Sequence, residues 1–196
     1  MVSTTGVMDP QLWEQFREFV RSENEETVRA IREQAFQAFT SLGYPTLRDE
    51  DWKYTNVTPI AKKTWSLQAP EKNAPAADTE ALRAFNFMRN GLTALNLAFA
   101  NVQVVRISSE TVVDEPIKLH FEAGEGSAIF PHVIVIAEAG CRATLVEYYS
   151  SPAESFTNTA AQVFIENNAN LTHYRVQREG SDAYHVGTTE VMLGAG

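Results

Sequence analysis

The most regular pattern of hydrophobic and polar positions lies in the last third of the chain, where it repeats about every 28 residues. An apolar run that includes Val135 returns with Val163 and, more faintly, with Val191, and Glu138 returns as Glu166. Each run enters a turn that carries Gly or Asn, the residues that reach positive φ most easily. A repeat of this length predicts units that stack on one another, as in a parallel β-solenoid. In such a solenoid the three valines would lie directly above one another.

Seven segments with the composition of short strands follow one another through the second half of the chain. They are residues 102–107, 117–122, 132–137, 143–149, 160–166, 171–177 and 184–192. Turn residues separate them and no helical pattern lies between them, so a sheet built from β-α-β units is not indicated. The pattern is compatible with a β-sandwich, a jelly roll or a solenoid, and the repeat favours the solenoid.

The first half of the chain has the apolar spacing of helices. Residues 10–22 and 24–42 each place their apolar side chains on one helical face, and Gly43 followed by Pro45 ends the second helix. Residues 81–100 predict a further helix and turn. The side chains expected to be buried there are Leu82, Phe85, Leu92, Leu95 and Phe99.

Between these patterns the chain is rich in Ala and Pro and lacks periodicity, most clearly in residues 66–80. We therefore expect a helical region at 1–65, a linker at 66–93, and the first coils of a parallel β-helix at 94–196. The fold class is α+β and mostly β. No strand follows the last turn, so we expect a truncated β-helix whose open end favours self-association of the chain.

The composition excludes several classes of protein. A net charge of −9 and a pI near 4.9 argue against general nucleic-acid binding and against docking on anionic membranes. A single cysteine, Cys141, cannot form an internal disulfide, and the first twenty residues carry no signal-peptide pattern. No apolar run approaches the length of a membrane span. We therefore expect a cytoplasmic protein.

The candidate chemistry is sparse. The four histidines, His120, His132, His173 and His185, have no metal-ligand spacing, although His173 and His185 lie on neighbouring predicted strands and are candidates to meet. A hydrogen-bonded strand histidine is the simpler interpretation of each, and a packed thiol is the simpler interpretation of Cys141. The sequence contains no Gly-x-Ser-x-Gly or Walker A motif. We therefore expect an assembly component, with no catalytic, cofactor-binding or metal-binding residue.

One segment, residues 44–55, combines charges with aromatic residues. Arg48, Trp52 and Tyr54 are candidate partner contacts, because Trp, Tyr and Arg dominate binding hot spots. The alternative is a short turn in which Trp52 and Tyr54 pack under the helices. The three consecutive carboxylates at 49–51 are expected to face water.

Several stretches together resemble the SufD family, scaffold subunits of the SUF iron–sulfur cluster assembly system. Residues 44–55 are similar to its signature P-T-x-x-x-E-x-W-K/R-Y-T. The other similar stretches are residues 94–100, 112–117, 139–147, 171–179 and 185–189. Each stretch alone is weak, but their combination in this order is specific and runs over most of residues 10–196.

The resemblance implies helices followed by a right-handed parallel β-helix, and a non-enzymatic role. It implies pairing with the homologous SufB through the β-helix and with the ATPase SufC through a C-terminal helical region. Because family members are about twice as long as this chain, it implies an N-terminal part that lacks the SufC-binding region. No cofactor is expected in this chain, since an iron–sulfur cluster is expected only in the full assembly.

Two other functions stay open. β-Solenoid enzymes that act on carbohydrate present clustered carboxylates and basic residues in a surface groove, and the sequence shows no such cluster. The other hypothesis is a peptide-binding module that uses the segment around Trp52.

Overall fold

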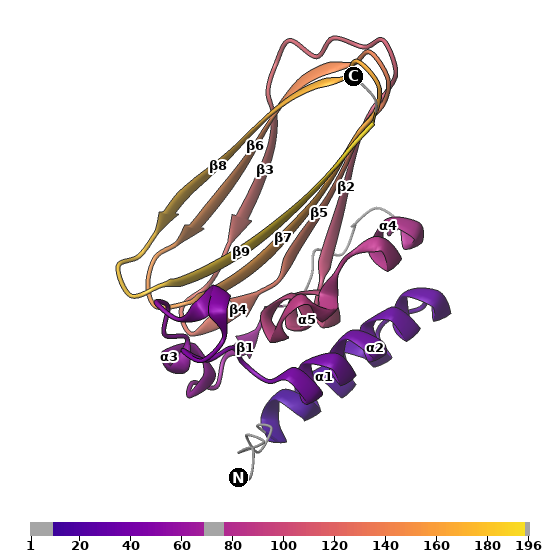
Figure 1. Ribbon diagram of the computed structural model, residues 1–196. Helices are drawn as coiled ribbons and strands as arrows, with labels where there is room; N and C mark the ends of the chain where they lie inside the picture. The colour runs from indigo at the N-terminus through magenta and orange to yellow at the C-terminus, as the bar shows by residue number, and fades with distance from the viewer. Residues whose placement is uncertain (1–9, 69–76, 195–196) are drawn as a thin grey trace.

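The computed structural model describes residues 10–68 and 77–194, and it places a group of helices against one end of a two-sheet parallel β-solenoid (Figure 1). The helices are α1 (Pro10–Arg21), α2 (Glu26–Leu42), α3 (Thr58–Ala61), α4 (Thr79–Ala84) and α5 (Gly91–Ala98), with short 3-10 turns η1 (Glu50–Trp52) and η2 (Phe87–Arg89). We call these elements together the helical cap.

The solenoid consists of two parallel sheets. Sheet A contains β1 (Ser66–Leu67), β2 (Asn101–Ile107), β4 (Ser127–Ile129), β5 (Pro131–Ala137), β7 (Phe156–Ile165) and β9 (Tyr184–Leu193). Sheet B contains β3 (Ile117–Glu122), β6 (Arg142–Ser151) and β8 (Asn170–Glu179). The chain alternates between the sheets and completes about three turns. The prediction of N-terminal helices followed by a parallel β-solenoid is confirmed, and parallel pairing excludes the sandwich and the jelly roll.

The register of sheet A matches the sequence repeat. Val135 pairs with Val163, and Val163 pairs with Val191, so the three valines lie above one another as predicted. In sheet B Thr144 pairs with Thr172. The predicted strands all exist, with ends that differ by a few residues, whereas the short strands β1 and β4 were not predicted.

The repeated glutamates connect one coil to the next. The carboxylate of Glu138 accepts a hydrogen bond from the backbone N–H of Ser109 at 3.1 Å, and that of Glu166 accepts one from Ala139 at 3.0 Å. Each acceptor lies about one turn later in the chain than its donor. The turn also requires Gly140, whose φ of 70° is costly for other residues. The repeated glutamate is therefore a turn-stabilising residue.

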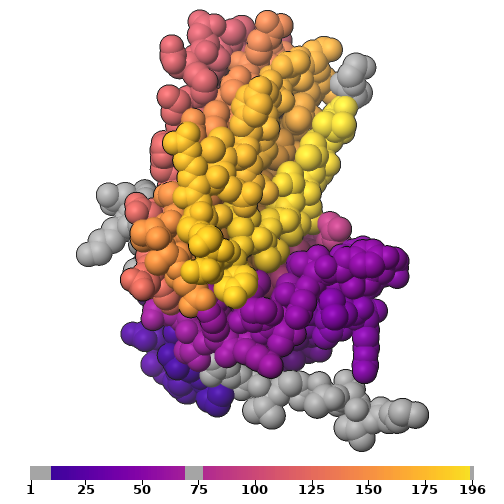
Figure 2. Space-filling model, turned by 90° about the vertical axis from the view of Figure 1, so that its left-hand side faces the viewer, coloured from indigo at the N-terminus to yellow at the C-terminus, as the bar shows by residue number. Residues whose placement is uncertain are grey.

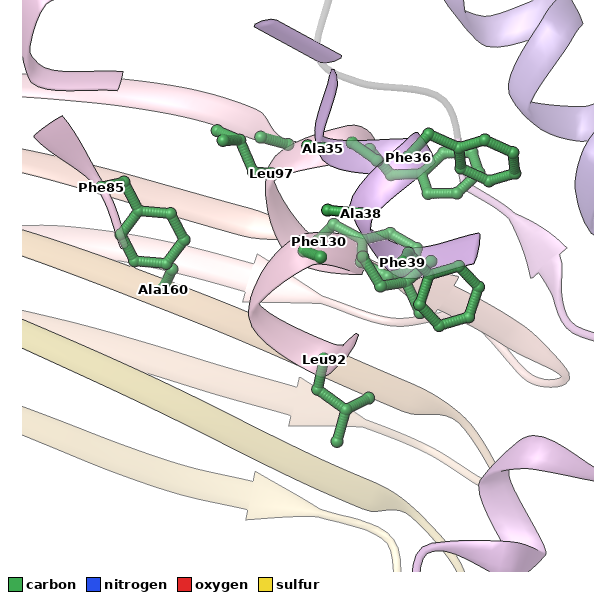
Figure 3. Packing of buried hydrophobic residues seen from close by; sticks show 14 of the residues in the cluster. Ala35, Phe36, Ala38, Phe39, Phe85, Leu92, Leu97, Phe130 and Ala160 are labelled. Carbon is green, nitrogen blue, oxygen red and sulfur yellow. The ribbon is translucent and has the colours of Figure 1, made fainter. Parts of the chain in front are cut away.

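Two hydrophobic cores hold the molecule together. The first fills the lumen between sheets A and B and includes Val133, Val135 and Leu145. The second lies between sheet A and the helical cap, where residues of α2 and α5 pack toward the strands (Figure 3). In this core the rings of Phe16 and Phe36 stack with centroids 3.9 Å apart.

The segment expected to be a linker, residues 66–93, contains several short elements of secondary structure in its described part. It contributes β1, α4, η2 and the start of α5, and residues 69–76 lie outside the described part. Leu82 and Phe85 are buried, as expected from their apolar character. Helix α5 begins at Gly91, and the side chain of Asn90 caps its N-terminus. Helices this short have little stability alone, and packing in the core between sheet A and the cap stabilises them.

None of the helices in the described residues has the length and the apolar content that crossing a bilayer requires.

Candidate functional site

The lumen of the solenoid changes from apolar to polar at its last described coil. Alternate residues of a strand face the same side, so the apolar Leu145 is followed along β6 by Glu147 and Tyr149. On β8 the residue paired with Leu145 is His173, and the residue paired with Glu147 is Arg175. Figure 2 shows the strands β8 and β9, near the yellow end of the colour scale, on an open face of the molecule.

We call this group of side chains the lumen cluster. Its members are Glu147 and Tyr149 on β6, Thr157 and Thr159 on β7, His173, Arg175 and Glu179 on β8, and His185 and Thr189 on β9. Both sheets therefore contribute, and the parallel register brings together residues from four strands.

Glu147 is the centre of the lumen cluster and is 0% exposed. The Tyr149 hydroxyl donates to its carboxylate, His173 Nε2 lies 2.6 Å from Oε1, and Arg175 Nε lies 3.4 Å from Oε2. Burial raises the pKa of Glu147, but the hydrogen bonds from His173 and Tyr149 and the charge of Arg175 outweigh it. The pKa of Glu147 therefore lies below its ordinary value, and the residue is ionised.

Tyr149 is locked in its protonated form. Its hydroxyl lies 2.7 Å from Thr159 Oγ1 as well as against the Glu147 carboxylate. Burial, and then the negative charge of Glu147, raise the pKa of Tyr149. The phenol is therefore a permanent donor and is not available as a base.

A second histidine–carboxylate pair lies beside the first. His185 Nδ1 lies 2.8 Å from Glu179 Oε2, and the Thr157 hydroxyl donates to Glu179 Oε1 at 2.7 Å. Burial raises the pKa of Glu179, but these two hydrogen bonds outweigh it and hold the pKa below its ordinary value. The His185 ring packs edge-on against Tyr149 with centroids 4.9 Å apart, which joins the two pairs.

Arg175 has room in the lumen because the facing residue on β9 is a glycine. A Cβ atom at Gly187 would lie 2.7 Å from Arg175 Nη1, too close for two non-bonded atoms. Arg175 Nη2 also donates to Thr189 Oγ1 at 3.3 Å. A side chain at position 187 would therefore require the Arg175 guanidinium to shift.

The lumen cluster offers matched charges and no free nucleophile–base pair. Its carboxylates are held by histidine and arginine, and its hydroxyls are engaged as hydrogen-bond partners. Within residues 10–68 and 77–194, no group of three or more His, Cys, Asp or Glu side chains is arranged to hold a metal ion. The arrangement fixes strand register and lines the lumen with charge.

The candidate contact residues of the sequence lie on the helical cap, away from the lumen. Trp52 packs against the core beneath the cap, as the packing alternative expected. Tyr54 points outward with 90% of its surface exposed, and Lys53 Nζ lies 5.2 Å from its ring centre. Arg48 is exposed in a turn. Whether these three residues bind a partner remains a prediction.

Three of the histidines and Cys141, which the sequence analysis considered as candidates, each have their own partners in the structure. His173 and His185 do not share a ligand, since each is paired with a glutamate. Cys141 is buried, and burial raises the pKa of its thiol, in agreement with a packed side chain. His120 is exposed and stacks on Tyr148.

Sequence reasoning missed seven of the nine members of the lumen cluster: Glu147, Tyr149, Thr157, Thr159, Arg175, Glu179 and Thr189. The available signal was the alternation along 171–179, in which polar residues occupy positions that a solenoid turns inward. Apart from the Glu147–Tyr149 contact within β6, their partners could not be read from the sequence, because the other contacts join different strands.

Comparison with known proteins gives two family matches. Residues 120–196 match the family model "SUF system FeS cluster assembly, SufBD core domain", and residues 10–85 match "SufBD protein N-terminal region". Together they cover more than three quarters of the chain. An iron–sulfur cluster assembly SufBD family protein of Synechocystis sp. is 27% identical over 104 residues, 46% of this chain. The chain spans 23% of the length of that relative. No solved structure matches the chain.

Proposed function

Because this chain belongs to the SufBD family of the SUF iron–sulfur cluster assembly system, we propose that it acts as a SufD-type, non-enzymatic scaffold component of that system. The observation that carries the proposal is the order of the two family regions on one folded unit. The N-terminal region forms most of the helical cap, and the core region forms the solenoid coils beyond β3. A scaffold needs a stable, extended surface, and stacked parallel strands provide one.

The chemistry of the described residues supports a scaffold over an enzyme. Glu147 and Glu179 lie inside the lumen and are engaged by histidines and other partners. A β-solenoid enzyme that acts on carbohydrate would need such carboxylates in a groove open to a polymer. The proposed scaffold holds no cofactor of its own, and the iron–sulfur cluster is the product of the larger assembly. A cytoplasmic location is part of this proposal.

The proposed partners are a SufB-like homologue and, for a longer form of the protein, a SufC-like ATPase. The solenoid is the expected SufB-like contact, because the outer edges of β8 and β9 have strand partners on one side only among the described residues. Unpaired strand edges recruit strands of another protein. We expect this chain alone not to bind the SufC-like ATPase.

Co-expression tests the proposal. The tagged chain is produced with the SufB and SufC homologues of the same genome, and the expected result is co-purification of the SufB homologue only. Tyr174→Arg on β8 and Met88→Arg on the helical cap form a matched pair, since the two residues are 56% and 55% exposed. We expect Tyr174→Arg to reduce the yield of the SufB homologue and Met88→Arg to leave it unchanged. Absence of the SufB homologue from the wild-type eluate would contradict the proposed function.

A further inference from the structure

His132, on β5, is buried where the helical cap meets sheet A, and both of its ring nitrogens face amide oxygens. The residue is 0% exposed. Nδ1 lies 2.8 Å from Oδ1 of Asn96 on α5, and Nε2 lies 2.9 Å from Oε1 of Gln162 on β7. The ring of Phe85 packs edge-on against the imidazole, with centroids 4.9 Å apart. The imidazole therefore links α5 to two strands of the sheet.

The orientation of both amides is fixed by their other hydrogen bonds. The side-chain nitrogen of Asn96 donates to the carbonyl of Pro131 at 3.0 Å and to that of Asn158 at 2.7 Å, so both of its N–H groups are used. The side-chain nitrogen of Gln162 donates to the carbonyl of Ala81 on α4 at 2.8 Å. Turning either amide would bring its oxygen against a carbonyl that its nitrogen now binds. The imidazole thus faces two acceptors.

A neutral imidazole has one proton to donate, so it cannot satisfy both oxygens. Burial lowers the pKa of His132 to about 4; the hydrogen bond with Gln162 opposes this shift, and the charge of Arg32 adds to it. Arg32, on α2, is the charged group among the described residues whose field acts on the ring. At neutral pH His132 can therefore donate a hydrogen bond to Asn96 or to Gln162, but not to both.

We propose that His132 is a tautomeric connector that donates its proton from Nδ1 to Asn96, while the Gln162 amide alternates between the imidazole and α4. The number of hydrogen bonds decides between the two tautomers. Turning the Asn96 amide breaks two bonds to backbone carbonyls, whereas turning the Gln162 amide breaks one, the bond to Ala81. The hydrogen bond from His132 to Asn96 on α5 is therefore permanent. The hydrogen bond from Gln162 to the Ala81 carbonyl on α4, which we call the tether, breaks and re-forms.

This makes α4 the adjustable element of the cap. Among the described residues, its other polar links to the rest of the molecule lie at its two ends. Asp78 faces Arg106 on β2 at 3.7 Å, and the backbone N–H of Asn86 faces the Glu190 carboxylate on β9 at 3.3 Å. A second proton on the imidazole would satisfy both amides, so the tether closes in acid. The protonation state of His132 thus determines whether the hydrogen bond between Gln162 and α4 is formed.

The tautomer can be read from the long-range 1H–15N spectrum of the histidine side chains at pH 7. The signals of His132 are assigned in the wild-type protein by nuclear Overhauser contacts with the ring of Phe85, which packs edge-on against the imidazole. We expect one protonated nitrogen, Nδ1. Protonation of both nitrogens, or of Nε2 alone, would overturn the proposal. This measurement uses the wild-type side chain, so it decides the question even where a variant folds poorly.

Two isosteric variants test the consequence for the helices. In His132→Asn the amide nitrogen takes a place close to that of Nδ1, and in His132→Gln it takes a place close to that of Nε2. We expect hydrogen-exchange protection of α5 to be retained in His132→Asn and to fall roughly tenfold or more in His132→Gln, since one buried hydrogen bond to Asn96 is lost. The reverse ranking, or equal protection in both variants, would overturn the proposal.

Discussion

Replacement of Glu147 by glutamine tests the interpretation of the lumen cluster most directly. The substitution keeps the size of the side chain and removes its charge. Arg175 then remains in the lumen without its counter-ion, and His173 loses its carboxylate partner. The Tyr149 hydroxyl retains an acceptor, so the loss falls on Arg175 and His173.

The magnitude follows from burial. Removing one member of a buried ion pair costs about 3–5 kcal/mol. The Glu147 side chain is fully buried, but those of His173 and Arg175 keep 19% and 24% exposure. We therefore expect Glu147→Gln to lower the free energy of unfolding by about 3 kcal/mol, the lower end of that range.

Urea denaturation at pH 7, followed by circular dichroism, measures this loss. Glu50→Gln is the matched control, because Glu50 pairs with Lys53 on the surface with 85% of its side chain exposed. Such pairs contribute little, so the control should unfold at the same urea concentration as the wild type. Equal stability of Glu147→Gln and the wild type would refute the argument that Glu147 is an ionised counter-ion inside the solenoid.

Three further predictions follow from the structure. Gly91→Ala should lower the melting temperature strongly, because its Cβ would lie 1.7 Å from the Gly43 carbonyl oxygen, whereas Gly124→Ala meets only ordinary contacts and should not. Glu147 has a folded pKa below the ordinary 4.5, so its stabilisation is present above pH 4.5 and is lost as the pH falls through the folded value. Urea midpoints measured between pH 7 and pH 3 should decline in that window for the wild type and less for Glu147→Gln. Cys141 should react with a thiol reagent at pH 8 far more slowly in the native than in the urea-unfolded protein, since burial raises the pKa of its thiol; rapid native labelling would show that the site is open.

Much of the solenoid could be predicted from local pattern alone. The spacing of Val135, Val163 and Val191 indicated stacked coils, and the observed register pairs them. The linker prediction shows the limit of such reasoning. Leu82 lies in α4 and Phe85 is its C-cap residue, and a helix of six residues depends on packing in the core between sheet A and the cap for its stability.

The candidate site was less accessible from the sequence. The sequence predicts hydrogen-bonded strand histidines at His173 and His185, which the structure agrees with, but it does not identify the glutamate partner of either. Glu147 and His173 are 26 residues apart, two short of the repeat, so the hydrogen bond runs diagonally between adjacent strands. A repeat identifies residues that stack, but it does not identify diagonal neighbours.

The sequence by itself determined the winding of the chain, because a strand's inward and outward faces and the residues of its turns are local properties that recur at a fixed interval. Only the tertiary structure decided which charges meet in the lumen and how His132 joins the cap to the sheet. The physical reason is that hydrogen bonds and ion pairs depend on distances of a few ångströms between separate strands and helices, and these distances are set by packing rather than by any one segment.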